Sequence, residues 1–324
     1  MSTPTHDDWR PSAPLGLLRL RAQLLQRARA YFTAGGALEV ETPVLVRAAV
    51  TDVHLESLAV HRSDGARVGF LHTSPEYAMK RLLCAGAPDI FQVARVFREG
   101  ERGRRHNPEF TMIEWYRLGM DHHALMRDVE ALLRALLEPV RSVEPTVHVT
   151  YADAFRSALG VDPLTASAAA IEAAARGAGL DIPPGLSGER DGLLDLAMAT
   201  LVTERFPADR ITFVRDFPAS QAALARTEGP IAARFEAFWG GLELANGFHE
   251  LGDAGEQARR FESDAATRRA RGQPARDADQ SFLAALASGL PPCAGVALGF
   301  DRVAMITAGA RSIDDIVAFP AERA

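Results

Sequence analysis

Residues 96–116 read VFREGERGRRHNPEFTMIEWY, a loop rich in arginine and glycine between two stretches of strand-forming residues. β-branched and aromatic residues are enriched in strands, so the composition predicts strands over residues 91–97 and 109–118. Side chains alternate between the two faces of a strand. One face of the second strand therefore carries Phe110, Met112, Glu114 and Tyr116, and the other carries Thr111, Ile113 and Trp115.

A carboxylate between aromatic side chains is unusual on a purely structural face, because its burial carries a desolvation cost. We therefore interpret the face that bears Glu114 as the floor of a nucleotide and substrate site. Arg98 stands at the base of the loop, and its planar guanidinium can bind two phosphate oxygens at once. Taken alone, the segment also fits an exposed hairpin with a solvated basic loop.

A second β-rich segment, RFEAFWGGLELANGFHEL over residues 234–251, predicts a hairpin that turns at Gly240-Gly241. This turn places Trp239 opposite Leu242 and Phe238 opposite Glu243. Glu236 then lies diagonally across from Glu243 on the same face, at a Cβ separation of about 7–8 Å. Two carboxylates at this spacing fit a Mg²⁺ that is also held by substrate phosphates. The same sequence pattern also fits two exposed glutamates on a solvated strand.

Three further polar or aromatic residues of this hairpin have the opposite parity from Glu243, namely Asn246, Phe248 and Glu250. If all of them face one pocket, the strand must contain a bulge. Glycine is common at bulges, so we expect the bulge near Asn246-Gly247.

The third segment, GVALGFDRVAMI over residues 295–306, changes from a strand of small residues to a helix near Asp301. Gly295, Ala297 and Gly299 share one face and leave it nearly bare, so a ligand could lie flat against the backbone. Arg302 falls in the first helical turn, where the helix dipole already favours anions. Phosphate binding explains an arginine at this position better than helix stability does.

The remaining chain is mostly helical. Apolar periodicity predicts helices over residues 15–34, 121–137, 165–177, 190–206 and 256–271, with a short terminal one from Ser312. Gly35-Gly36 ends the first helix, and a strand over residues 37–41 follows. Paired strands with helices elsewhere indicate an α+β fold with a mixed or antiparallel sheet. We expect residues 1–14 to form a flexible tail and residues 15–324 to form a single domain.

Composition narrows the function. The chain has a net charge of −6, which argues mildly against a nucleic-acid-binding surface, and 47% of its residues are hydrophobic, as in soluble globular proteins. Residues 1–10 lack a secretory signal, and no apolar run has the length of a membrane span, so we expect a cytoplasmic protein with no membrane partner. Lys80 is the only lysine, which we attribute to an arginine-favouring composition.

Three stretches of the chain, taken in sequence order, resemble the conserved motifs of class II aminoacyl-tRNA synthetases. LEVETPVL (38–45) resembles motif 1, residues 96–116 resemble motif 2, and GVALGFDR (295–302) resembles motif 3. HTSPEYAMKRLL (72–83) and the hairpin are similar to the lysine-specific enzymes. Those enzymes carry an anticodon-binding domain before the catalytic domain, whereas only a short tail is expected here. Free-standing domains of this kind resemble the elongation factor P–(R)-β-lysine ligase family, and the similarity covers residues 15–324.

The resemblance implies an α+β, class II synthetase-like catalytic domain with a mainly antiparallel sheet flanked by helices. It implies ATP-dependent activation of (R)-β-lysine or lysine as the adenylate, followed by transfer to a lysine side chain of elongation factor P. It also implies ATP and Mg²⁺ as substrate and cofactor, a homodimer built by the first helix and strand, and no dependence on tRNA. The rival expectations are a truncated lysyl-tRNA synthetase and a catalytically silent regulatory subunit.

The resemblance also assigns roles to individual residues. Arg98 would hold the α-phosphate and Arg302, with His106, the β- and γ-phosphates, and these two arginines would be catalytic. The other ATP-binding residues would be Glu99, Gly100, Asn107, Phe110, Glu243, Leu244 and Gly299, with Phe110 stacking on the adenine. Glu236 and Glu243 would hold Mg²⁺. The amino-acid substrate would be surrounded by Ser74, Pro75, Glu76, Glu114, Tyr116, Asn246 and Glu250.

Two positions depart from the family pattern of the tRNA enzymes. Gly100 stands where a glutamate that contacts adenine is expected, and Glu101 could serve instead. Ala297 stands where the tRNA enzymes carry glycine, and its methyl group would narrow the amino-acid pocket as in the protein-modifying ligases. The sequence does not separate α-lysine from (R)-β-lysine, and it does not identify the acceptor residue.

Overall fold

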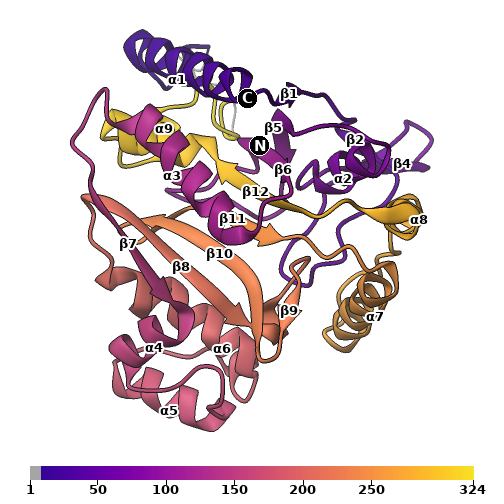
Figure 1. The fold of residues 1–324 in the computed structure, drawn as a ribbon, viewed down its shortest axis with the longest axis vertical. Helices are drawn as coiled ribbons and strands as arrows, with labels where there is room; N and C mark the ends of the chain where they lie inside the picture. Colours follow the sequence, from indigo (N-terminus) through magenta and orange to yellow (C-terminus); the bar gives the residue numbers. More distant parts are fainter. Residues whose placement is uncertain (1–8) are drawn as a thin grey trace.

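The computed structural model describes residues 9–324, and a large mixed sheet runs through this part of the chain (Figure 1). Eight of its nine described strands lie side by side in the order β1 (Leu38–Glu39), β5 (Ile90–Phe97), β6 (Glu109–Leu118), β12 (Cys293–Gly299), β11 (Leu242–His249), β10 (Ile231–Trp239), β8 (Arg210–Pro218) and β7 (Glu144–Thr150). The ninth, β9 (Thr227–Glu228), pairs with β10. Only the outer pairs β1–β5 and β7–β8 are parallel, which confirms the expected α+β fold with a mainly antiparallel sheet.

A smaller sheet lies beside the large one. Its strands are β2 (Leu45–Val46), β4 (Arg67–Leu71) and β3 (Ala59–His61), in that order. The segment that follows it leads into α2 (Glu76–Cys84), so residues 72–76 approach the large sheet from this side.

Three helices cover one face of the large sheet, namely α1 (Leu15–Ala34), α3 (His122–Leu137) and α9 (Phe300–Ala308) (Figure 1). Their apolar sides meet the sheet in a core that includes Phe32, Leu133 and Trp115. The sequence predicted α1 and α3 to within a residue. Asp121 caps α3, because its carboxylate accepts a hydrogen bond from the backbone N–H of Ala124.

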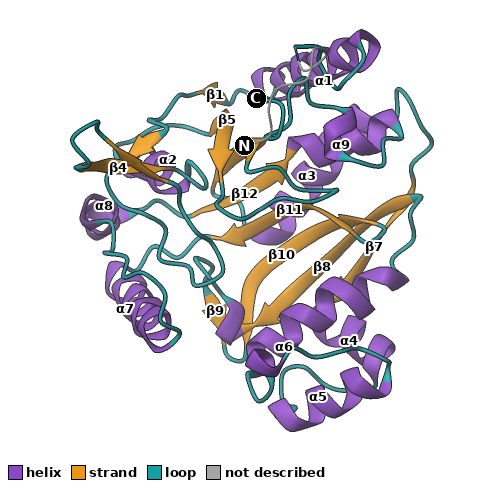
Figure 2. Ribbon diagram, turned by 180° about the vertical axis from the view of Figure 1, so that it is seen from behind, coloured by secondary structure: helices purple, strands orange, loops and turns teal. Residues whose placement is uncertain are grey.

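A second core lies beyond β7 and β8, where α4 (Tyr151–Leu159), α5 (Ala168–Gly177) and α6 (Arg190–Ala197) gather (Figure 2). The helix predicted over residues 190–206 is confirmed, because residues 190–205 are helical throughout, but the α geometry of α6 ends at Ala197 and is followed by a π-helical turn over Met198–Val202 and a 3₁₀ turn over Thr203–Arg205. The Thr200 hydroxyl bonds the Leu196 carbonyl oxygen within this stretch. Threonines that bond backward in this way disturb a regular helix.

On the opposite side of the sheet, α2 packs against α8 (Gln280–Gly289), and α8 packs against α7 (Ala254–Ala270). The sequence predicted α7 but missed α2, α4 and α8, which are short. The terminal helix expected from Ser312 is a single 3₁₀ turn, Ile313–Asp315. None of the described helices is long and apolar enough to cross a membrane.

Part of the expected tail over residues 1–14 is anchored. Residues 1–8 lie outside the described residues. Ala13, in contrast, is completely buried, and the backbone N–H of Ser12 donates to the carbonyl oxygen of Ala318. The start of the described chain is therefore tied to its end.

Candidate active site

A cleft of about 1470 Å³ opens on the face of β6, β12, β11 and β10 that is turned away from α3. Pockets for one small ligand usually measure about 300–1000 Å³, so this cleft has room for a nucleotide and a second substrate. Most of the residues selected from the sequence line it, namely Ser74, Pro75, Glu76, Arg98, His106, Asn107, Phe110, Glu114, Tyr116, Glu236, Glu243, Leu244, Asn246, Glu250, Gly299 and Arg302. Glu99 and Gly100 do not line the cleft, whereas Glu101 does.

Arg98 follows the end of β5 and projects into the cleft. Its guanidinium lies 5.1 Å from the centre of the Phe110 ring, and its Nη1 lies 3.3 Å from the carboxylate of Glu101. The buried Nε of Arg98 has no hydrogen-bond partner among the residues that the structure describes. A buried donor without a partner fits a site for an anionic ligand.

Gly100 has a backbone conformation that explains its identity. Its φ angle of 78° lies in the left-handed region, which side chains disfavour. A glutamate at this position would therefore be strained in this loop. Glu101, one residue later, reaches both the cleft and Arg98, which supports its expected role as the substitute.

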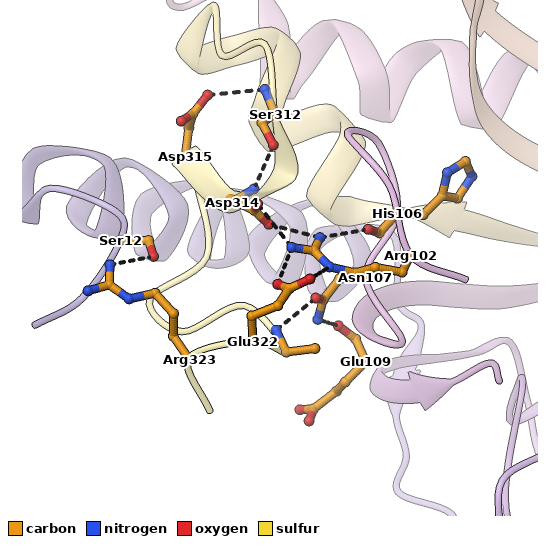
Figure 3. A network of polar contacts seen from close by, with 11 residues as sticks. Ser12, Arg102, His106, Asn107, Glu109, Ser312, Asp314, Asp315, Glu322 and Arg323 are labelled. Carbon is orange, nitrogen blue, oxygen red and sulfur yellow. Dashed lines mark hydrogen bonds and ion pairs between the residues drawn. The ribbon is translucent and has the colours of Figure 1, made fainter. Parts of the chain in front are cut away.

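The loop between β5 and β6 is held by the C-terminal segment (Figure 3). Arg102 pairs with Asp314 at 3.1 Å and also with Glu322. Asn107 accepts a hydrogen bond from the backbone N–H of Ala321 and donates one to the carbonyl oxygen of Glu109. Both ends of the Asn107 amide thus have protein partners, and a contact between Asn107 and adenosine stays a prediction.

Arg302 joins two of the predicted segments. It lies in the first turn of α9, and its Nη1 donates to the carbonyl oxygen of Glu243 at 2.8 Å. Its Nη2 lies 2.8 Å from Nε2 of His106. Arginine can only donate, so Nε2 accepts and the imidazole proton resides on Nδ1. Burial, and then the charge of Arg302, lower the pKa of His106, which keeps its ring neutral.

The hairpin forms as predicted at its turn, with Trp239 opposite Leu242 and Phe238 opposite Glu243. The predicted position of the bulge is wrong. Ala237 pairs with Ala245, so the extra residue is Leu244 and not Asn246 or Gly247. Even so, this bulge exchanges the faces on which the later residues of β11 lie, and it brings Asn246 opposite Glu236.

Gly247 is required for a different reason. A Cβ atom at Gly247 would approach the ring of Phe235 to under 3.0 Å, and real Cβ atoms do not come so close. The glycine therefore makes room for an aromatic ring of the neighbouring strand and does not mark the bulge.

Glu236 and Glu243 both reach the cleft. Burial raises the pKa of Glu236 to about 7, and the neighbouring Glu243 adds to this effect while Arg234 opposes it. Arg234 was missed by the sequence analysis. Its Nη2 donates to Glu236 at 2.6 Å and its Nε to the side-chain oxygen of Asn246 at 3.2 Å. The available signal was the alternation of side chains along a strand. Arg234 precedes Glu236 by two residues on β10, so the two side chains share a face.

The other end of the cleft is acidic. The carboxylate of Glu114 accepts hydrogen bonds from the Ser74 hydroxyl at 2.7 Å and from the Tyr116 hydroxyl at 2.8 Å. Burial, and then the charge of Glu76, raise the pKa of Glu114 to about 8. Burial likewise raises the pKa of Glu250 to about 8, although Lys80 opposes it.

Lys80 is the second functional candidate that the sequence analysis missed. It lies behind the cleft wall and pairs with both Glu76, at 2.6 Å, and Glu250. The available signal was the spacing of four residues between Glu76 and Lys80, which places both on one side of a helix.

Gly295 lines the cleft as expected, but the strand face there is less bare than the sequence suggested. A Cβ atom at Gly295 would lie under 3.0 Å from both the Tyr116 ring and the Glu250 carboxylate. Two side chains of the acidic end therefore fill this space. At Gly299, in contrast, the nearest atom to an added Cβ is 3.6 Å away, so that end of the strand is open.

The Gly295→Ala substitution is expected to reduce the free energy of unfolding by about 1–3 kcal/mol, because the added methyl overpacks a buried space. Gly299→Ala on the same strand is the matched control and is expected to change it by less than about 0.5 kcal/mol. Chemical denaturation of both variants measures the difference. Equal stability of the two variants would show that the Gly295 space can relax.

The antiparallel sheet, the arginines after β5 and in α9, and the loop between β5 and β6 together define a class II aminoacyl-tRNA-synthetase-type catalytic domain. The family model for tRNA synthetases class II (D, K and N) matches residues 6–323. The chain is 45% identical over 324 residues to the elongation factor P–(R)-β-lysine ligase of Klebsiella pneumoniae subsp. pneumoniae and 44% identical to that of Salmonella dublin. Each comparison covers 98% of both chains.

The chain therefore belongs to the elongation factor P–(R)-β-lysine ligase family, within the class II synthetases of the D, K and N type.

Proposed function

We propose that this protein is an ATP-dependent ligase that activates (R)-β-lysine, or lysine, as its adenylate and transfers the acyl group to a lysine side chain of elongation factor P. One observation carries the proposal. A single cleft joins two arginines suited to phosphates, Arg98 and Arg302, to three carboxylates suited to a diamine, Glu76, Glu114 and Glu250. The names of the relatives supply the acceptor and the particular diamine.

ATP would bind at the arginine end. Arg98, with its unpartnered Nε, would hold the α-phosphate, and Arg302 with His106 would meet the β- and γ-phosphates. Phe110 would stack on the adenine and Asn107 would contact the adenosine, with Leu244 and Gly299 along the side of the nucleotide. Glu99 and Gly100 would act through the backbone of their loop, because their side chains do not line the cleft.

Mg²⁺ would lie between Glu236 and Glu243. Burial, together with the neighbouring charge of Glu243, raises the pKa of Glu236 and disfavours its ionised form, and a bound cation would offset both effects. The described residues contain no cluster of three or more metal ligands, so phosphate oxygens would complete the coordination, as is usual for this ion. When bound, the metal would neutralise charge on the departing phosphates.

The amino acid would lie with its ammonium groups on the three acids and its carboxylate toward Arg98. A carboxylate oxygen would attack the α-phosphorus, form the mixed anhydride and break the bond to pyrophosphate. An acceptor amine would then attack the carbonyl carbon, release AMP and lose a proton to solvent. The protein contributes positioning and stabilises phosphate charge.

The remaining parts of the proposal concern assembly and location. Large apolar side chains are exposed on α1, β1 and β2, with Leu15 68% and Leu38 52% exposed. Exposed apolar residues at these elements support the expected homodimer. A cytoplasmic location and independence from tRNA follow from the proposed acceptor, a translation factor.

The test is pyrophosphate exchange by the purified protein with (R)-β-lysine, (S)-β-lysine, L-lysine and norleucine. We expect exchange with at least one diamine and none with norleucine, which lacks the second amine. Mass spectrometry of elongation factor P should then show one added acyl group. Charging of tRNA without modification of elongation factor P would favour a truncated synthetase, and the absence of exchange with every substrate would favour a silent subunit.

The proposal predicts a pH dependence of the KM for the diamine. In the empty cleft the pKa values of Glu114 and Glu250 are raised to about 8, so both carboxyls hold protons below that pH. They must lose these protons to accept ammonium groups. The KM should therefore fall as the pH rises from 6 toward 8 and then level off. A KM that is constant over this range would contradict the ammonium-binding role of these acids.

A further inference from the structure

Lys80 differs from every other basic side chain of the protein. It is the only lysine among 36 basic residues, and it is 0% exposed. It lies in α2 and does not line the cleft, so a ligand there does not touch it. A compositional preference for arginine accounts for the other basic positions but does not account for this one.

The surroundings of Lys80 hold its ammonium group in place. Nζ pairs with Glu76, one turn earlier in α2, and with Glu250, which follows β11. The ring of Phe282 in α8 lies 5.9 Å from Nζ. Burial alone would lower the pKa of Lys80, but Glu250 and Glu76 raise it well above its usual value. The ammonium group is therefore charged at neutral pH.

The charges at this end of the cleft can be counted. Glu76, Glu114 and Glu250 carry three negative charges when all are ionised, and Lys80 supplies one positive charge. Nearby Cys84 and Cys293 are neutral thiols, because burial raises the pKa of each. Arg226 donates to the backbone oxygen of Glu250. The balance left for a ligand among the carboxylates and Lys80 is two negative charges.

We propose that Lys80 is a positioning residue that sets the specificity of the cleft for a substrate with two ammonium groups. From behind the cleft wall, its ammonium group keeps the carboxylates of Glu76 and Glu250 separated and cancels one of the three negative charges. This inference rests on the proposed function and deepens it, because it names the residue that matches the acidic end to a diamine. An arginine is not equivalent to it, because a planar guanidinium is larger than an ammonium group and the side chain at this position is fully buried.

The decisive variant is Lys80→Met, which keeps the length of the side chain and removes its charge. Loss of one partner from a buried ion pair is costly, so we expect the KM for the diamine to rise by roughly 100-fold while the KM for ATP changes by less than about threefold. Lys80 lowers the pKa of both Glu114 and Glu250. Without it, the pH above which the KM levels off should move upward.

Arg117→Met is the matched control. Arg117 is also a buried cation between two acids, Asp128 at 2.7 Å and Asp89 at 3.3 Å, but it lies on the opposite face of β6 from Glu114. We expect this variant to lose stability without a change in the KM for the diamine or in its pH profile. An equal change of KM in both variants, or no change in a folded Lys80→Met variant, would overturn the proposal.

Two further measurements keep the result interpretable. Lys80→Arg retains the charge and changes the geometry. If Lys80→Met does not fold, the arginine variant should show a raised KM for the diamine with an unchanged pH profile. A shifted pH profile in a folded Lys80→Arg variant would overturn the proposal. Calorimetric binding of L-lysine and norleucine needs no catalysis. If the wild-type protein exchanges no pyrophosphate, the proposed function is wrong. The role of Lys80 is then tested separately by binding, because Lys80→Met should reduce the preference for lysine over norleucine, and an unchanged preference would contradict that role.

Discussion

Replacement of Arg98 by alanine is expected to slow adenylate formation by about three powers of ten. The buried Nε of Arg98 has no hydrogen-bond partner within residues 9–324, and charge accumulates on the α-phosphate as pyrophosphate leaves. A fixed cation in a partly buried site stabilises this charge without reorganising. Pyrophosphate exchange under saturating substrates measures the loss directly.

Folding should be unaffected by this substitution, because the ion pair of Arg98 with Glu101 is partly exposed. Arg95→Ala is the matched control. Arg95 lies three residues earlier on β5, points to solvent and pairs loosely with Glu109 at 3.7 Å. We expect it to retain normal exchange. An Arg98→Ala variant with a normal rate would remove this residue from the mechanism.

The second large effect is expected from Glu114→Gln. The amide keeps the shape of the side chain and can still bond Ser74 or Tyr116, but it cannot offset an ammonium group. Removal of one partner from a buried charged pair typically costs 2–5 kcal/mol, so the KM for the diamine should rise by about 10²–10³-fold. The KM for ATP should stay constant, because Glu114 lies at the other end of the cleft.

Tyr116→Phe separates charge from hydrogen bonding in the same place. It removes only the hydroxyl that donates to Glu114, so a rise in KM of about tenfold or less is expected. If Glu114→Gln and Tyr116→Phe raise the KM equally, the carboxylate contributes no charge-specific binding, and the assignment of this end of the cleft to a diamine is wrong.

Patterns among residues that are close in the sequence predicted much of this site. Alternation along β6 correctly placed Glu114 and Tyr116 on one face, and Gly240-Gly241 fixed the hairpin register near its turn. These features depend on neighbouring residues, so a sequence pattern reveals them. The strand-to-helix change before Arg302 is local in the same way.

Features that depend on distant residues were not predictable in this way. The bulge at Leu244 depends on how β10 and β11 pair with β8 and β12. The identity of Gly295 depends on Tyr116, which is distant in the sequence. The pairing of Lys80 with Glu250 also joins two distant segments, so only the i, i+4 relation of Lys80 to Glu76 was visible beforehand.

The burial of Lys80 has a consequence for an enzyme that works through a reactive anhydride intermediate. Such an anhydride acylates any free amine that it contacts. The first amines within its reach are those of the protein that forms it. Here the single lysine is shielded, protonated and locked between two acids, and all the other residues in the count of lysines and arginines are arginines. The catalyst thus presents no exposed lysine amine of its own to be damaged.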